Sequence, residues 1–148
     1  MLLNFALLAL AASPDDKTSW NDLAWGSAPP TNAKCAPGPA EMVVCSRPPT
    51  SVTTEMMKES LCYWNNRLMG TMLAMPFSEE RLAFFKNDLV RRYGDVTRDI
   101  SGGWGWSGKS IVIAALRDSK DNEIHINYYY TPIYLEYRAK VGVITEGL

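Results

Sequence analysis

The middle of the chain has the hydrophobic spacing of an α-helix. Between Thr54 and Met75, apolar side chains recur at steps of three and four residues, which places them along one helical face. These side chains are Met57, Leu61, Trp64, Leu68, Met72 and Met75. Thr53 or Thr54 can cap the start of this helix, and Pro76 would end it. We therefore predict a first helix over residues 54–75.

A second amphipathic segment follows directly. Ser78 is a favourable N-cap residue, and Glu79 and Glu80 come next, where the helix dipole favours negative charge. Gly94 suits the position just after the last turn. The expected buried stripe consists of Leu82, Phe85, Leu89 and Tyr93. These signals predict a second helix between Ser78 and Gly94.

Residues 102–130 have the pattern of a small antiparallel sheet. A stretch rich in glycine and tryptophan precedes the β-branched run Ile111–Leu116, and apolar and polar residues then alternate over Glu123–Tyr130. Turns are expected at Ser107-Gly108 and across residues 118–122. The stretch therefore predicts a three-stranded β-meander.

The turn at residues 118–122 sets the expected register of this meander. The expected pairs are Leu116 with Ile124, Ala114 with Ile126 and Val112 with Tyr128. Together with Gly103 and Gly105, these residues would form the face on which the helices lie. The opposite face would carry Trp104, Trp106, Ile111, Ile113, His125, Asn127 and Tyr129, with Arg117 and Glu123 paired at its edge. Because a shift of one residue reverses both faces, the turn decides this assignment.

The remaining segments complete the predicted architecture. Seven prolines disfavour long helices and central strands in residues 13–53, apart from a short edge strand at Glu41–Cys45. Residues 133–141 are expected to form a short C-terminal helix or tail. We predict an α+β fold in which two helices pack on a three-stranded antiparallel β-meander, as one domain over residues 54–148.

Composition and charge narrow the class of protein. The chain has 148 residues and a formal net charge of -1, which disfavours nucleic-acid binding and electrostatic attachment to a membrane. Residues 1–12 are apolar on every side and too short to span a bilayer, and Ala9-Leu10-Ala11 offers small residues to a signal peptidase. We therefore expect a signal peptide and a periplasmic or secreted protein. An N-terminal core helix is the alternative.

The cysteines fit an oxidising compartment, where one pair is expected to bridge. Cys35 and Cys45 bracket a short loop rich in proline and glycine, so a local disulfide is easy to form and would stabilise the fold by about 2–3 kcal/mol. Cys62 would remain a buried thiol on the first helix. The segment Glu41-Met42-Val43-Val44-Cys45-Ser46-Arg47, preceded by Cys35, resembles a segment of small exported bacterial proteins of unknown function. This resemblance implies export and a disulfide.

Gly103–Ser110 matches the phosphate-binding pattern G-x-x-x-x-G-K-S. A functional loop of this kind lies between a strand and a helix. Here Ile111–Leu116 has the composition of a strand, and two tryptophans inside the loop would crowd a phosphate. We interpret the match as a glycine-rich β-hairpin and expect no nucleotide.

Two further groups of residues are candidates for a binding site. Met69, Met72 and Met75 offer soft thioether ligands for Cu(I), which Cys62 or His125 could complete, although methionine is also a common core residue. The second group is the aromatic face, whose expected binding residues are Trp104, Trp106, His125, Asn127 and Tyr129. Exposed aromatic side chains on a rigid sheet can recognise a partner, unless a helix covers them.

The sequence therefore favours a non-enzymatic, exported envelope protein without a cofactor, which recognises a protein or cell-envelope partner through its aromatic face. The alternative is a periplasmic protein that binds a small ligand or Cu(I) through the methionine cluster. A small hydrolase is third, because His125 is the only histidine and no nucleophile elbow accompanies it.

Overall fold

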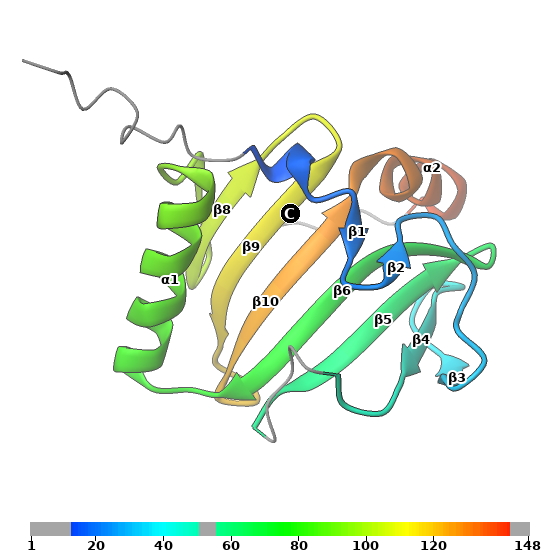
Figure 1. The fold of residues 1–148 in the computed structure, drawn as a ribbon, viewed down its shortest axis with the longest axis horizontal. Helices are drawn as coiled ribbons and strands as arrows, with labels where there is room; N and C mark the ends of the chain where they lie inside the picture. Colours follow the sequence, from blue (N-terminus) through cyan, green and yellow to red (C-terminus); the bar gives the residue numbers. More distant parts are fainter. Residues whose placement is uncertain (1–12, 51–55, 143–148) are drawn as a thin grey trace, which may run out of the picture.

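The computed structural model describes residues 13–50 and 56–142. Its main feature is one antiparallel sheet of eight strands in the order β3-β4-β5-β6-β10-β9-β8-β7 (Figure 1). These strands are β3 (Lys34–Pro37), β4 (Val43–Ser46), β5 (Lys58–Trp64), β6 (Arg67–Pro76), β7 (Arg98–Ile100), β8 (Gly103–Ser107), β9 (Ile111–Asp118) and β10 (Glu123–Tyr130). The other elements are the 3-10 helix η2 (Pro14–Asp16), β1 (Ser19–Trp20), β2 (Leu23–Ala24), α1 (Glu79–Tyr93) and α2 (Thr131–Val141).

The predicted first helix over residues 54–75 is wrong, because its described part forms the β-hairpin of β5 and β6. Asn65 and Asn66 turn this hairpin with φ angles of 50° and 60°, as a type I′ turn requires. Strand β6 is buried on both of its faces, so its apolar residues do not alternate and mimic helical spacing. The predicted caps Thr53 and Thr54 lie outside the described residues.

The predicted fold class is wrong for the same reason. Strands β8, β9 and β10 form the expected meander, but β10 also pairs with β6 from Glu123↔Pro76 to Tyr129↔Gly70. The residues expected to form a helix therefore extend the sheet instead of covering it. The described chain is mostly β, with an eight-stranded sheet, a two-stranded sheet and two α-helices.

The second predicted helix is confirmed as α1. Ser78 is its N-cap and accepts a hydrogen bond from the backbone N–H of Arg81 at 3.1 Å. Leu82 and Leu89 are buried, and the N–H of Gly94 closes the last turn. The C-terminal helix expected over residues 133–141 is α2. The caps of α1 are strong local signals, which explains why the sequence located this helix, whereas α2 has no side-chain hydrogen bond at its N-cap.

The register of β9 and β10 differs by one residue from the predicted one. Arg117 pairs with Ile124, Ala115 with Ile126 and Ile113 with Tyr128. The face that carries Ile113, Ala115, Ile124, Ile126 and Tyr128 is buried, and we call it the core face. The opposite face, which we call the outer face, carries Val112, Ala114, Leu116, His125, Asn127 and Tyr129. The predicted pair of Arg117 and Glu123 is wrong, because these side chains point to different faces.

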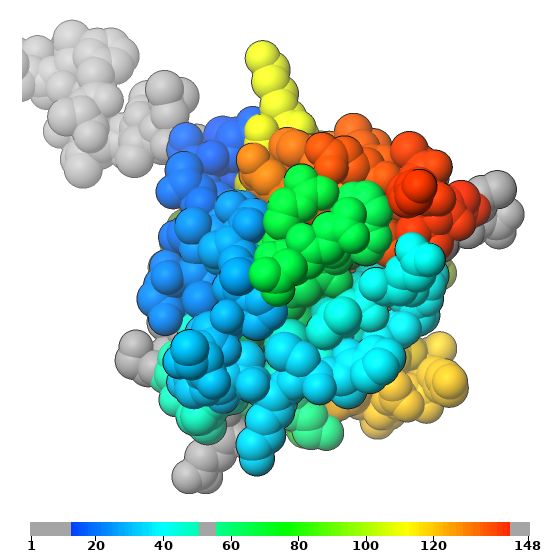
Figure 2. All heavy atoms as spheres, turned by 90° about the vertical axis from the view of Figure 1, so that its right-hand side faces the viewer, coloured from blue at the N-terminus to red at the C-terminus, as the bar shows by residue number. Residues whose placement is uncertain are grey.

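The two faces are covered by different parts of the chain. Helix α1 and the N-terminal segment, which we define as residues 13–25, cover the core face (Figure 1). Helix α2 packs on one end of the outer face through a small cluster consisting of Trp64, Met69, Ile133 and Tyr137. Figure 2 shows the N-terminal region (blue), β3 and β4 (cyan) and α2 (orange to red) around the tip of the β5–β6 hairpin (green).

The predicted disulfide between Cys35 and Cys45 is present and links directly opposed residues of β3 and β4. It is compatible with an oxidising environment outside the cytoplasm. Cys62 has a free thiol and lies in β5, not on a helix. Across residues 13–50 and 56–142, the helices lack the combination of length and hydrophobicity that crossing a bilayer demands.

Candidate functional site: a cleft beneath the N-terminal segment

A cleft of about 280 Å³ opens on the core face between α1 and the N-terminal segment. Strands β6 and β10 provide its floor. The apolar and aromatic lining residues are Trp20, Met57, Leu73, Phe85, Leu89, Ile126 and Tyr128. The polar lining residues are Lys17, Asn21, Asp88 and Arg92. A mostly apolar cavity with a few polar side chains is the usual composition of a small-molecule site.

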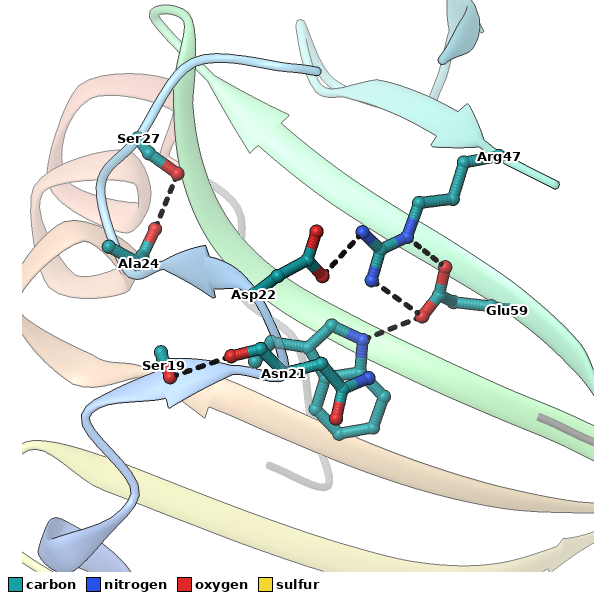
Figure 3. A network of polar contacts seen from close by, with 8 residues as sticks. Ser19, Asn21, Asp22, Ala24, Ser27, Arg47 and Glu59 are labelled. Carbon is teal, nitrogen blue, oxygen red and sulfur yellow. Dashed lines mark hydrogen bonds and ion pairs between the residues drawn. The ribbon is translucent and has the colours of Figure 1, made fainter. Parts of the chain in front are cut away.

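Trp20 lines the cleft and donates to a polar network of Asp22, Arg47 and Glu59, whose contacts Figure 3 shows. Its ring lies 4.9 Å from the Tyr128 ring, and its Nε1–H donates to Glu59 Oε2 at 2.8 Å. Arg47 donates to Glu59 and to Asp22, each at 2.8 Å. The side chains of Arg47 and Glu59 are only 4% and 5% exposed, so this ion pair is largely shielded from water.

The network shifts the pKa values of Arg47 and Asp22. The hydrogen bond to Glu59 raises the pKa of Arg47, and the hydrogen bond from Arg47 lowers the pKa of Asp22. Both shifts favour the charged forms of Arg47 and Asp22. A buried charge that loses its partner is strongly destabilising, so the network fixes Trp20 and the adjoining wall of the cleft.

Lys17 places a positively charged ammonium group in the lining of the cleft. Its Nζ lies 5.1 Å from the centroid of the Trp20 ring and 5.3 Å from that of Tyr128. Burial and the nearby positive charge of Arg92 lower its pKa. In the part of the chain that the structure describes, no carboxylate pairs with this ammonium. It is therefore a half-buried cation held by cation–π contacts alone.

The other polar groups of the cleft leave its hydrogen-bond donors available. The Asn21 amide nitrogen is buried and has no acceptor within residues 13–50 and 56–142. Asp88 pairs with Arg91 and, at 3.1 Å, with Arg92, so its negative charge is compensated. Burial raises the pKa of Tyr128, whose hydroxyl therefore stays neutral. The cleft thus offers donors and positive charge to a ligand that supplies acceptors.

The sequence did not identify this site, because Lys17, Trp20 and Asn21 lie in the segment expected to be loosely structured. One signal was available. Trp20, Leu23 and Trp25 place three large apolar side chains in six residues, and such side chains are usually buried. Trp20 is 4% exposed and Leu23 is 8% exposed, so the segment belongs to the core.

The structure separates the five residues predicted for the aromatic face. His125, Asn127 and Tyr129 lie on the outer face, whereas Trp104 and Trp106 lie on the core face. Trp106 is 0% exposed and donates its indole N–H to the Gly94 carbonyl at 3.0 Å. Trp104 lies beneath Lys86, whose Nζ is 4.3 Å from its ring. The reversal follows from the one-residue difference in register.

The three outer-face residues have different neighbours. His125 Nε2 lies 3.4 Å from Glu123 Oε1 and 3.7 Å from Asp118 Oδ2, and its side chain is 15% exposed. The Asn127 side-chain oxygen is buried and has no hydrogen-bond partner among the described residues. The Tyr129 ring contacts Tyr134 of α2 at 5.4 Å. This face thus combines a charged end with a half-buried apolar centre.

The methionine cluster does not form in β6. Met69 packs beneath α2, and Met72 lies on the outer face opposite Asn127. Met75 is buried on the core face opposite Ile124. The three sulfur atoms therefore do not converge as Cu(I) ligands would. Among the described residues, no group of three or more His, Cys, Asp or Glu side chains is placed to hold a metal ion.

The G-x-x-x-x-G-K-S stretch is strand β8 followed by a turn into β9, as the hairpin interpretation requires. Its turn nevertheless binds a carboxylate. Asp15 accepts hydrogen bonds from the backbone N–H groups of Lys109 (2.9 Å), Ser110 (2.7 Å) and Ile111 (3.1 Å). A Cβ atom on Gly108 would lie 2.4 Å from an Asp15 oxygen, so a side chain at this position would displace the carboxylate.

Comparison with known proteins adds no assignment to this geometry. The chain matches no protein-family model, no curated protein and no solved structure.

Proposed function

We propose that this protein binds a small amphipathic anion, namely a carboxylate or similar group on an apolar body, in the cleft beneath the N-terminal segment. The observation that carries the proposal is the Lys17 ammonium, which lines the cleft without a counter-ion among the described residues. A ligand carboxylate would pair with Lys17 and accept from Asn21, and its apolar part would contact Phe85 and Ile126.

The volume and lining of the cleft favour a small ligand. About 280 Å³ lies just below the range of about 300–1,000 Å³ that is common for small-molecule sites. The described lining includes no cysteine, serine or histidine that could act as a nucleophile or general base. Binding is the activity that we propose, and it corresponds to the small-ligand alternative from the sequence without its methionine site.

Titration calorimetry with decanoate tests the proposal, with decanol as a neutral counterpart of the same chain length. We expect decanoate to bind more tightly, because a hydrogen bond to a charged group contributes about 1.5–3 kcal/mol. The variant Lys17→Met keeps an aliphatic side chain over the rings and removes the charge. It should weaken decanoate binding by about tenfold or more and abolish the preference over decanol.

The matched control is Lys86→Met, which removes an ammonium from the Trp104 ring, away from the cleft. Its affinity for decanoate should equal that of the wild type. Equal binding of decanoate and decanol by the wild type would contradict the proposal, as would an unchanged affinity in Lys17→Met. Failure of the wild type to bind either compound would contradict it too.

The second function that we propose is self-association through the outer face. It replaces the recognition of another protein or envelope component that the sequence predicted. Its centre is half-buried and apolar, at Met72, Val112 and Leu116, and α2 covers only one end. Basic Arg98 and Arg138 border the end near α2. The acidic pair Asp118 and Glu123 lies at the other end. A two-fold axis through this face would set basic ends against acidic ends, so the partner we propose is a second copy of the chain.

Sedimentation velocity over a wide range of concentration tests this second function. The wild type should dimerise, and Leu116→Asp should be monomeric because it places a charge in the apolar centre. Phe84→Asp is the control, since Phe84 is 64% exposed on α1 and lies outside the outer face. A monomeric wild type would exclude self-association, and binding of a different protein without dimerisation would exclude it as well.

Export to the periplasm or the exterior remains part of the proposal. The apolar residues 1–12 and the disulfide of Cys35 and Cys45 support it. Intact mass of the gene product from a bacterial host, measured with and without thiol alkylation, is the test. A mass that lacks about the first dozen residues, with one alkylatable cysteine, is expected. An uncleaved chain with three free thiols would overturn the localisation.

A further inference from the structure

The Asp15 carboxylate occupies a ready-made anion site. Consecutive backbone N–H groups at Lys109, Ser110 and Ile111 converge on its two oxygens. Such concave groups of N–H donors are used by proteins to bind phosphate and other anions. Here the bound anion belongs to the same chain, 94 to 96 residues earlier in the sequence. The contact therefore ties the N-terminal segment to the turn between β8 and β9.

This tie is one of two anchors of the residues that border the cleft. At the other anchor, Trp20 donates to the buried Glu59 at 2.8 Å. Between the anchors lies Lys17, whose carbonyl accepts from Trp25 Nε1 at 2.9 Å. The two anchors differ in burial, because Trp20 is 4% exposed, whereas the Asp15 contact is exposed at Lys109 and partly buried at Ser110 and Ile111. The Asp15 end is therefore the more exposed of the two anchors and the one expected to open first, with Pro14 as the buried residue that it uncovers.

We propose that Asp15 is a clasp that controls entry to the cleft. When the carboxylate leaves the turn, residues 13–17 lift away together, and Lys17 moves off the Tyr128 ring. When it returns, Lys17 is placed over the cleft again. The control of ligand entry rests on the proposed ligand-binding function. The opening and closing of the Asp15 contact is a property of the ligand-free protein.

The charges around Asp15 give the clasp a defined pH dependence. The N–H groups of Ser110 and Lys109 are the main cause of its lowered pKa, and the positive charge of Lys109 adds to this effect. Because the pKa is lowered from 3.8, the clasp is closed at neutral pH and above. It opens as the pH falls below 3.8 through the lowered pKa, because protonation removes the charge that the N–H groups bind.

Amide hydrogen exchange of the full chain without ligand tests the clasp. In Asp15→Ala, the amides of Lys109, Ser110 and Ile111 should exchange about tenfold faster, since each loses a charge-assisted hydrogen bond. The Trp25 indole N–H, whose acceptor is the Lys17 carbonyl, should accelerate with them if the segment opens as a unit. Added acetate should slow the exchange of the three turn amides, because it can occupy the emptied site.

Asp121→Ala is the matched control, since it removes one carboxylate from an exposed turn. Its exchange should equal that of the wild type, and the Ile126 amide in β10 should be unchanged in both variants, which shows that the sheet is intact. Unchanged exchange of the turn amides in Asp15→Ala would overturn the clasp. Faster turn amides with an unchanged Trp25 indole N–H would overturn the concerted opening.

Stopped-flow mixing with decanoate then tests the consequence for the cleft. Asp15→Ala should bind and release decanoate about tenfold faster than the wild type and Asp121→Ala. Unchanged rates, with the accelerated amide exchange present, would overturn control of entry. If the wild type does not bind decanoate while the exchange results hold, the proposed function fails and the clasp stands, so the two failures are distinguishable.

Discussion

The core face and the outer face of the sheet are made by alternate residues of the same strands, yet they are packed differently. In β10, Ile124, Ile126 and Tyr128 are buried on the core face, whereas His125 and Asn127 are half-buried on the outer face. The difference arises because α1 and the N-terminal segment both return to the core face. Burial in this protein is therefore set by where distant segments pack as well as by the composition of the strand.

Two isomeric side chains of β9 provide the sharpest test of this comparison. Ile113 is 0% exposed on the core face, and Leu116 is half-buried on the outer face. Ile113→Ala should lower the free energy of unfolding by about 3–4 kcal/mol, because it leaves a cavity in a closed core. Leu116→Ala should cost less than about 1.5 kcal/mol. Urea denaturation measures both, and equal losses would show that the outer face is as tightly packed.

Breaking the buried ion pair beneath the N-terminal segment should cause the next largest loss of stability. Arg47→Met leaves the Glu59 carboxylate buried without its partner, which should cost about 3 kcal/mol. The double variant Arg47→Met, Glu59→Leu removes both charges and should recover part of that loss. Thermal unfolding of the two variants measures the difference. A double variant that is less stable than the single one would contradict this account of the network.

The disulfide at the edge of the sheet should contribute less than the core residues do. It closes a loop with a sequence separation of 10, so removing it by a Cys35→Ala, Cys45→Ala variant should cost about 2–3 kcal/mol. The loss should be confined to β3 and β4, because β3 is an edge strand. Hydrogen exchange resolves the location, and faster exchange spread evenly across β9 and β10 would contradict a local role.

The smallest expected effect concerns the free thiol of the outer face. Burial raises the pKa of Cys62 from 9.0 to about 11, so almost all of the thiol is protonated at pH 8. Alkylation by iodoacetamide at that pH should be about a hundredfold slower than for a free cysteine, and its rate should rise about tenfold per pH unit up to about pH 11. Rapid alkylation at pH 8 would show that this part of the outer face is more open than the structure describes.

Local signals explain which elements the sequence predicted. Ser78 and Gly94 mark the two ends of α1, and both act within one turn of the helix. The disulfide was equally local, because Cys35 and Cys45 are close in sequence. The β5–β6 hairpin was missed although Asn65-Asn66 is a turn signal, since apolar residues on both faces of β6 gave the spacing of a helix.

The candidate site could not be predicted in the same way, because its residues meet only through the fold. Asp15 binds a turn 94 to 96 residues away, and Trp20 donates to Glu59 from 39 residues away. The predicted aromatic face failed for a related reason. A change of one residue in the turn after Asp118 shifts β10 against β9. This shift decides whether Trp106 lies on the same side of the sheet as His125.

The sequence by itself determined the helix that begins after Ser78, the three strands between Gly103 and Tyr130, and the disulfide, because each depends on interactions between near neighbours. The tertiary structure alone decided that β6 joins these strands and which residues face the core. It also decided that the Asp15 carboxylate fills the turn and that Lys17 lies over the cleft. The physical reason is that pairing and burial depend on segments that are distant in the chain, and no local pattern specifies which of them will meet.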